Sequence, residues 1–138
     1  MNFSKTTEYA LRILSFMSND EAKLYTANEI FDELKIPFRY LRKQLTILSK
    51  SGLMISEQGI RGGYRLTKSP DQIFLSEIVL ATGENVLENQ CFFGFKQCAL
   101  EHKCAMHDRW LEVNQKISEV LSSTTLAALK GTKLPDII

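Results

Sequence analysis

Residues 26–66 read TANEIFDELKIPFRYLRKQLTILSKSGLMISEQGIRGGYRL, and this stretch decides the fold. Its start, Thr26-Ala27-Asn28-Glu29, is a capping-box pattern, in which the threonine hydroxyl and the glutamate carboxylate satisfy backbone donors at a helix start. The apolar face that follows predicts a short helix ending near Lys35. Pro37 has the fixed φ angle that suits the first position of a further helix, and Ser51-Gly52 marks the end of that helix. The stretch therefore predicts a helix, a tight turn and a second helix.

A glycine-rich hairpin is predicted directly after this helix pair. Its two short strands cover 53–57 and 64–67, and the loop over 58–63 contains three glycines, which tolerate positive φ angles. This order of elements is that of a winged helix-turn-helix. In that fold the second helix enters the major groove of DNA, and the hairpin, or wing, contacts the backbone or the minor groove.

Helical periodicity extends the prediction to the rest of the chain. It predicts helices over 5–17 and 76–81, a long helix from 105 onward, and a last short helix over 125–130. With 138 residues, 44% apolar and 24% charged, the composition is that of one soluble domain. We expect a mostly helical fold with a small β-hairpin. The predicted parts are a winged helix-turn-helix domain over 1–83, a loop over 84–104, and a long helix with a C-terminal segment over 105–138.

Charge is strongly segregated along the chain. Residues 35–68 carry eight lysines and arginines and one glutamate, a net charge of +7, whereas the whole chain carries +1. Such a segment attracts polyanions, because each phosphate contact releases condensed counterions. An ordinary solvated face is the alternative, and for Tyr40 the alternative is a place at the edge of the core. The candidate residues for binding double-stranded DNA are Arg39, Tyr40, Arg42, Lys43, Thr46, Arg61 and Arg65.

Three cysteines lie in the predicted loop, at Cys91, Cys98 and Cys104. In a reducing compartment such a group indicates metal binding or redox chemistry more often than disulfides. Thiolates suit iron–sulfur clusters, zinc or copper(I), and the spacing here is wider than the CxxC of structural zinc sites. If the long helix begins near Cys104, His107 lies on the same helical face, so both can point at one metal site. Buried, unreactive cysteines and a surface histidine are the alternatives.

The long helix carries an apolar seam. Met106, Trp110, Val113, Ile117 and Val120 follow one another at intervals of 4, 3, 4 and 3 residues, which is heptad spacing. A stripe of this kind usually packs on the core of its own domain. We favour a homodimer contact, because two recognition helices must lie about one DNA turn apart to read a palindrome.

Several other classes of protein fit the sequence less well. The longest apolar stretch, 74–81, is far shorter than the roughly 20 residues that cross a bilayer, and the start lacks the apolar region of a signal peptide. We therefore expect a cytoplasmic protein with no membrane contact. No orienting third group or oxyanion motif accompanies a Cys–His pair, so an enzyme is not indicated. A small iron–sulfur electron-transfer protein would leave the +7 segment unexplained.

Four parts of the sequence resemble the Rrf2 family of bacterial transcription regulators. They are TTEYALR at 6–12, the run from Tyr40-Leu41 to Gly52-Leu53, the wing RGGYRL at 61–66 and the three-cysteine loop. The resemblance covers nearly the whole chain. It implies a winged-helix homodimer, expected to be a repressor, that binds a two-fold symmetric operator. It also implies that the affinity for DNA changes when an iron–sulfur cluster is lost or altered in response to iron, redox state or nitric oxide.

The resemblance further implies a ligand set. The three cysteines fall where the family places its cluster thiolates, and His107 falls where the IscR-like branch places the fourth ligand of a 2Fe-2S cluster. Residues 7–12 are more similar to the NsrR-like branch, in which an acidic residue, here Glu8, can supply the fourth ligand of a 4Fe-4S cluster from the other subunit. Six residues separate Cys91 from Cys98, where IscR-like members usually have five. The 2Fe-2S cluster is favoured, and 4Fe-4S stays open. Family members without a cluster, which respond to a protein or small ligand, are the alternative.

Overall fold

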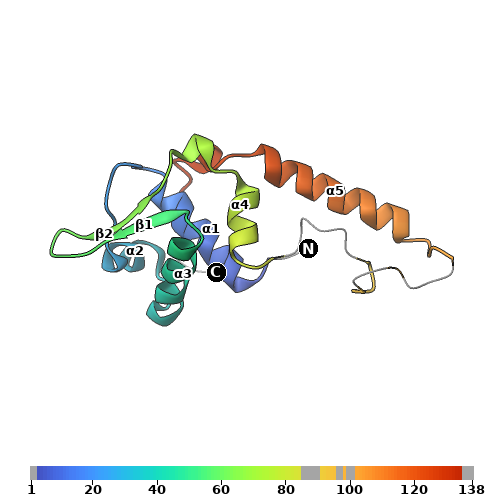
Figure 1. Cartoon of the computed structure of the whole chain (residues 1–138), viewed down its shortest axis with the longest axis horizontal. Helices are drawn as coiled ribbons and strands as arrows, with labels where there is room; N and C mark the ends of the chain where they lie inside the picture. Colours follow the sequence, from blue (N-terminus) through green and yellow to red (C-terminus); the bar gives the residue numbers. More distant parts are fainter. Residues whose placement is uncertain (1–2, 85–90, 96–97, 99–101, 135–138) are drawn as a thin grey trace.

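The computed structural model describes residues 3–84, 91–95, 98 and 102–134. In this part of the chain, one end of the molecule holds four helices and a two-stranded hairpin, and one long helix projects from it (Figure 1). The elements are α1 (Lys5–Met17), α2 (Ala27–Leu34), α3 (Phe38–Lys50), β1 (Met54–Glu57), β2 (Gly63–Leu66), the 3-10 helix η1 (Pro70–Gln72), α4 (Leu75–Ala81), α5 (His107–Ser123) and the 3-10 helix η2 (Leu126–Leu129). The predicted mostly helical class with one small hairpin is confirmed.

The turn between α2 and α3 differs in detail from the prediction. Thr26 caps α2 by accepting a hydrogen bond from the Glu29 amide at 3.1 Å, but the Glu29 carboxylate forms an ion pair with Lys23 at 3.1 Å. Lys35 ends α2 in the left-handed region, with φ 54°. Pro37 is the N-cap of α3 and not its first helical residue, because its ψ angle of 130° is extended. Its carbonyl accepts hydrogen bonds from two amides of the first turn of α3.

A leucine stripe fixes the orientation of α3. Leu41, Leu45 and Leu48 are at most 1% exposed and belong to one core cluster with Ile13 and Leu14 of α1. α3 also contacts α1 directly. Since the leucines occupy one side of α3, the opposite side faces solvent.

The hairpin is tied to the helices at its base. β1 and β2 are antiparallel, with buried Met54 opposite buried Leu66. Tyr25, just before α2, exchanges two backbone hydrogen bonds of 2.8 Å with Tyr64 of β2. At the other end, a Cβ atom on Gly62 would lie 2.1 Å from the Glu57 carbonyl oxygen, so the turn requires glycine there. The hairpin therefore has a fixed base and a tight tip.

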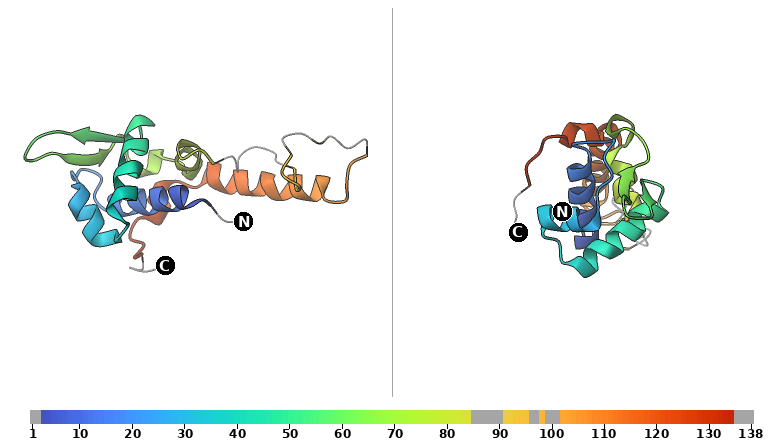
Figure 2. Two further views of the ribbon diagram at one scale, coloured as in Figure 1. Left: turned by 90° about the horizontal axis from the view of Figure 1, so that it is seen from below. Right: turned by 90° about the vertical axis from the view of Figure 1, so that its left-hand side faces the viewer.

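α5 is attached to the rest of the molecule at its C-terminal end. Leu121 and Leu126 are buried there, and the Leu126 amide donates to the Ile73 carbonyl at 2.7 Å. The Leu75 amide donates to the Thr124 carbonyl at 2.9 Å. From this anchor α5 extends away from the hairpin end (Figure 2). The expected last helix is present as the 3-10 helix η2. In the part of the chain that the structure describes, no helix has the length and apolar character needed to span a bilayer.

A carboxylate joins the end of α4 to the start of α1. Glu84 Oε1 accepts hydrogen bonds from the Ser4 amide at 2.6 Å and from the Thr7 hydroxyl at 2.9 Å. Thr7 is fully buried, and its hydroxyl also lies 2.7 Å from that of Thr82. Hydrogen bonds from Ser4, and then from Thr7, lower the pKa of Glu84 below its ordinary value. Glu84, the last described residue before Cys91, is thus held against the start of α1.

We expect Glu84→Gln to reduce the free energy of unfolding at neutral pH by about 1 kcal/mol, after allowing for partial exposure, because a neutral amide accepts weaker hydrogen bonds. The lowered pKa means that the contribution is present above the ordinary carboxyl pKa. It is lost as the pH falls through the lowered value in the folded protein. Urea unfolding of both proteins from neutral pH to about pH 3 should therefore show a shrinking difference.

Glu21→Gln, at an exposed glutamate, is the matched control and should leave the free energy of unfolding nearly unchanged. A difference for Glu84→Gln that stays constant with pH would contradict the assignment.

Candidate nucleic-acid interface and cysteine segment

The outer face of α3 is basic. Arg39, Arg42, Lys43 and Thr46 are all exposed, on the side opposite the buried leucines. α3 contains no acidic residue, so no carboxylate of its own helix compensates these cations. The positive end of the helix dipole adds to the field at its first turn. This face can hold several phosphates at once.

Two arginines of α3 lie over aromatic rings. Arg39 Cζ lies 5.0 Å from the centre of the Tyr40 ring, and its Nη2 donates to the Tyr40 hydroxyl at 3.1 Å. Arg42 Cζ lies 5.7 Å from the centre of the Phe38 ring, which itself contacts Phe31 edge-on. Both rings restrict side chains that would otherwise move freely, so the cations are partly ordered before any ligand arrives. Neither stacking contact was predicted for the α3 face, although Phe38 and Arg42 are four residues apart, a spacing that favours contact on a helix.

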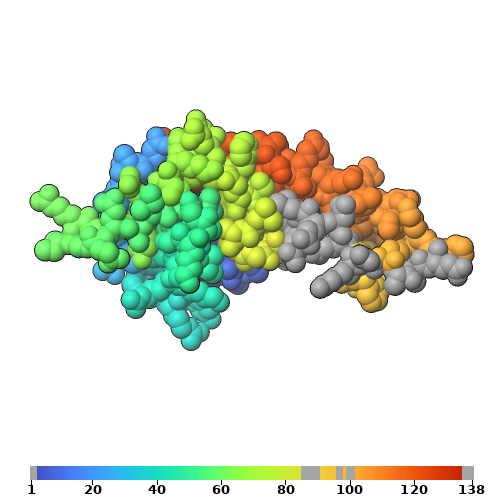
Figure 3. Space-filling model, in the orientation of Figure 1, coloured from blue at the N-terminus to red at the C-terminus, as the bar shows by residue number. Residues whose placement is uncertain are grey.

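The wing places Arg61 at its tip. The Gly62 amide donates to the Gly59 carbonyl at 3.0 Å, which closes a turn with Ile60 and Arg61 at its two central positions. Both side chains are exposed, and Ile60 is fully so, at 106% of its reference area. The space-filling view shows the wing projecting to the left and α3 projecting downward from the same half of the molecule (Figure 3). The tip therefore carries the cation of Arg61 beside the apolar side chain of Ile60.

Arg65 differs from the other predicted contact residues. It lies on β2, and its Nε is 3.2 Å from Glu57 Oε1 on the neighbouring strand, an ion pair without hydrogen-bond geometry. The Arg65 side chain is 42% exposed, so part of it still reaches solvent. Its charge is partly compensated within the wing, whereas that of Arg61 is not among the ion pairs of the described residues.

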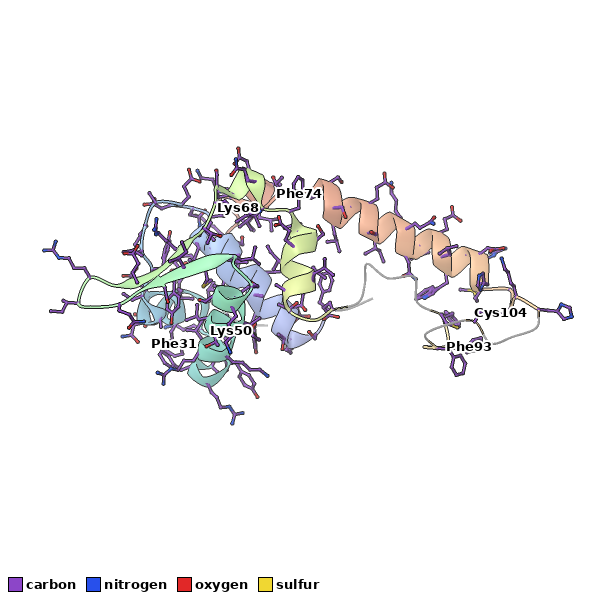
Figure 4. The ribbon with its side chains drawn as sticks, viewed as in Figure 1. Phe31, Lys50, Lys68, Phe74, Phe93 and Cys104 are labelled. Carbon is purple, nitrogen blue, oxygen red and sulfur yellow. The ribbon has the colours of Figure 1, made fainter. Side chains whose placement is uncertain are left out.

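Residues 91–95, which include Cys91, pack on the projecting end of α5. Cys91 opens a turn in which the Gly94 amide donates to its carbonyl at 2.9 Å, and the Phe93 amide lies 3.4 Å from its sulfur atom. The Phe92 ring contacts the Trp110 ring of α5 edge-on, with centroids 5.2 Å apart. Phe93 and Cys104 lie at the same end of α5 (Figure 4). The three cysteines are free thiols, of which Cys98 is exposed and the others are half-buried.

The condition for placing Cys104 and His107 on one helical face is not met, because Cys104 lies before the start of α5. α5 begins at His107, with Met106 as its N-cap, and Cys104 precedes it in a turn. The His107 amide donates to the Cys104 carbonyl at 3.1 Å, which keeps the two residues adjacent. The turn, and not helical periodicity, sets their relative position.

The donor set fits an iron–sulfur cluster by its chemistry. Three unpaired thiols and two imidazoles, those of His102 and His107, fall within residues 91–107, and thiolates with imidazole are ligands of such clusters. In the described ranges, no three histidine, cysteine or acidic side chains gather around one point. Glu8 is on α1, paired with Lys5 at 3.1 Å and Arg12 at 3.7 Å. In one chain α1 lies well away from the end of α5 that carries Cys104 (Figures 1 and 4).

The apolar seam of α5 is only partly covered within one chain. Val113 and Val120 are 45% and 49% exposed, while Trp110 and Ile117 are half-buried. Leu80 on α4, which packs beside α5, is 54% exposed. Val113 and Val120 therefore leave an apolar strip exposed along α5.

Comparisons with known proteins agree on one family. The family model Rrf2, described as "Iron-dependent Transcriptional regulator", matches residues 3–131. The HTH-type transcriptional regulator NsrR of Geobacillus kaustophilus is 32% identical over 131 residues, covering 94% of this chain and 89% of that protein. The HTH-type transcriptional regulator IscR of Erwinia tasmaniensis is 33% identical over 101 residues, covering 73% of this chain and 61% of that protein.

A solved structure supports the same fold. CymR, the global cysteine regulator of B. subtilis, superposes with a TM-score of 0.79 at 23% identity, covering 93% of this chain and 97% of that chain. At this identity the likeness concerns the fold alone. The predicted winged helix-turn-helix is confirmed.

Proposed function

Because this chain belongs to the Rrf2 family of transcriptional regulators, we propose that it is a homodimeric repressor whose affinity for a two-fold symmetric operator is controlled by an iron–sulfur cluster. A transcriptional regulator of this family is a DNA-binding protein and not an enzyme. The observation that carries the proposal is the exposed basic face of α3 beside a wing tipped with Arg61.

DNA binding is assigned to α3 and the wing. α3 enters the major groove, with Arg39 nearest its N-terminal end, where recognition helices reach base edges. Arg42, Lys43 and Thr46 follow along the same face and contact bases or phosphates. Arg61 enters the minor groove, where a narrow groove attracts a guanidinium. Arg65 and Tyr40 play lesser parts, since Glu57 and Arg39 already engage them.

Dimerisation is assigned to α5. Its partly uncovered strip, with Val113 and Val120, is suited to the same strip of a second copy, because a two-fold interface is self-complementary. The predicted parts 1–83, 84–104 and 105–138 then become the DNA-binding, cluster-binding and dimerisation parts of the chain.

Control of the affinity for DNA is assigned to the segment between α4 and α5. Cys91, Cys98, Cys104 and His107 would hold a 2Fe-2S cluster, with Glu8 from a second copy as the alternative ligand of a 4Fe-4S cluster. Such a cluster supplies a redox-active centre that is altered by oxidants, nitric oxide or iron shortage. Ligation would draw the cysteines together, between the Glu84 anchor on α1 and the Trp110 end of α5. The relative placement of the two recognition helices would change when that ligation is lost.

For the DNA surface, we expect Lys43→Ala to weaken binding to operator and random duplex alike. The slope of log affinity against log salt should fall by about one, because one phosphate contact is lost. Fluorescence anisotropy at several salt concentrations measures this, with DNA selected by the wild-type protein from a random duplex pool. Lys116→Ala on α5 is the control and should leave both values unchanged. If the wild-type protein selects no sequence from the pool, the proposed function fails.

For the cluster, we expect protein purified without oxygen to be coloured and to contain iron and inorganic sulfide. Mössbauer spectra distinguish the 2Fe-2S from the 4Fe-4S form. Cys98→Ala should lose the colour and change operator affinity by about tenfold, within the usual range of coupling between two sites. Phe95→Ala, in the same segment, is the control. Iron-free wild-type protein, or equal operator affinities, would favour the cluster-free regulator that responds to a protein or small ligand.

The fourth ligand is tested with two further variants. His107→Ala should abolish the native cluster spectrum if the imidazole is a ligand, and Glu8→Ala should leave it unchanged. The reverse result would assign the site to Glu8 of the second copy and favour the 4Fe-4S form.

A further inference from the structure

Four side chains form a continuous row from α1 to the start of α3. Arg12 Cζ lies 5.5 Å from the centre of the Tyr9 ring. The Tyr9 and Tyr40 rings are tilted by 47° with centroids 6.2 Å apart. Tyr40 in turn lies under Arg39, which also donates to the Tyr40 hydroxyl at 3.1 Å. The row thus ends at the first cation of the proposed recognition face.

Burial in this row decreases from the core outward. Tyr9 is half-buried and packs against the core cluster, whereas Tyr40 is 43% exposed and Arg39 is exposed. Among the residues that the structure describes, Tyr9 is the aromatic residue whose ring contacts the ring of Tyr40. An arginine that binds DNA loses rotamer freedom, so holding it beforehand reduces the cost of recognition.

We infer that Tyr9 is a positioning residue for sequence recognition, which acts by holding Tyr40 and, through Tyr40, the guanidinium of Arg39. This inference rests on the proposed function. Arginine at the start of a recognition helix pairs with the O6 and N7 atoms of guanine through two hydrogen bonds. Tyr9 therefore supports the recognition of a guanine base by Arg39. The group required for this is the ring of Tyr9 and not its hydroxyl.

The DNA-binding test compares Tyr9→Leu with the conservative Tyr9→Phe. We expect Tyr9→Leu to reduce the preference for the selected operator over random duplex by about five- to tenfold, within the range of one base contact. The salt slope should not change, because no phosphate contact is lost. Tyr9→Phe should keep the wild-type preference. Replacing guanines of the operator one at a time by 7-deazaguanine should identify one position that matters to wild type and not to Tyr9→Leu.

A double-mutant cycle shows whether Tyr9 acts through Arg39. If it does, Tyr9→Leu combined with Arg39→Ala should bind the operator no more weakly than Arg39→Ala alone. Additive losses would overturn the inference, as would an unchanged operator preference in Tyr9→Leu. Tyr40→Phe offers a milder change, which removes only the hydroxyl that Arg39 contacts and should cost about two- to threefold in preference.

A measurement without DNA separates the inference from the proposed function. In the free protein, NMR should show the Arg39 Nε–Hε signal shifted by the adjacent ring, with the shift lost in Tyr9→Leu and kept in Tyr9→Phe. Thermal unfolding of the variants reports whether the fold survives. An Arg39 signal that is the same in all three proteins would overturn the positioning role, even if the operator is bound. A wild-type protein with the shifted signal but no selected operator would overturn only the proposed function.

Discussion

The structure depends on the burial of one leucine stripe. Leu41, Leu45 and Leu48 of α3 are almost completely excluded from water and share a core with α1. Removing one such side chain typically costs about 2–5 kcal/mol, whereas a whole domain is stable by only about 5–15 kcal/mol. Rotation of α3 about its own axis is therefore excluded. The cations on the opposite side are exposed because of this packing, and the wing, joined to α3 by a few residues, is held beside them.

Much of the fold follows from signals that are local in the sequence. The apolar period of the first helix predicts Lys5–Met17, and the structure has the same bounds. Ser51-Gly52 ends α3 as predicted, with Gly52 at a φ of 85°. The errors at the start of α3 and α5 come from the choice between a helical residue and the residue just before it. That choice depends on the ψ angle of Pro37 and on the turn after Cys104, which periodicity does not contain.

The chemistry of the site was predictable, but its pairings were not. Residue type and spacing identified the basic face and the thiols, because charge and sulfur ligation depend on composition. The partners of these groups lie elsewhere in the chain, as with Glu57 across the hairpin from Arg65, or Trp110 against Phe92. The contact of Tyr9 with Tyr40 joins two helices and has no local signal. Such pairs follow from strand register and helix packing, which are set by the whole core.

Among the described residues, α5 is joined to the hairpin end of the molecule at its own C-terminal end, so a small rotation there displaces its other end by a larger distance. Its C-terminal end is held by buried Leu121 and by the backbone hydrogen bonds around Leu126, while its other end projects with the cysteine segment. A helix of 17 residues is about 25 Å long. A pivot of about 5° at the anchored end would sweep the far end through about 2 Å, by the same geometry. Small adjustments near the DNA-binding core are therefore amplified at the thiols. Conversely, a rearrangement of a few ångströms at the thiols reaches the core as a rotation of only a few degrees.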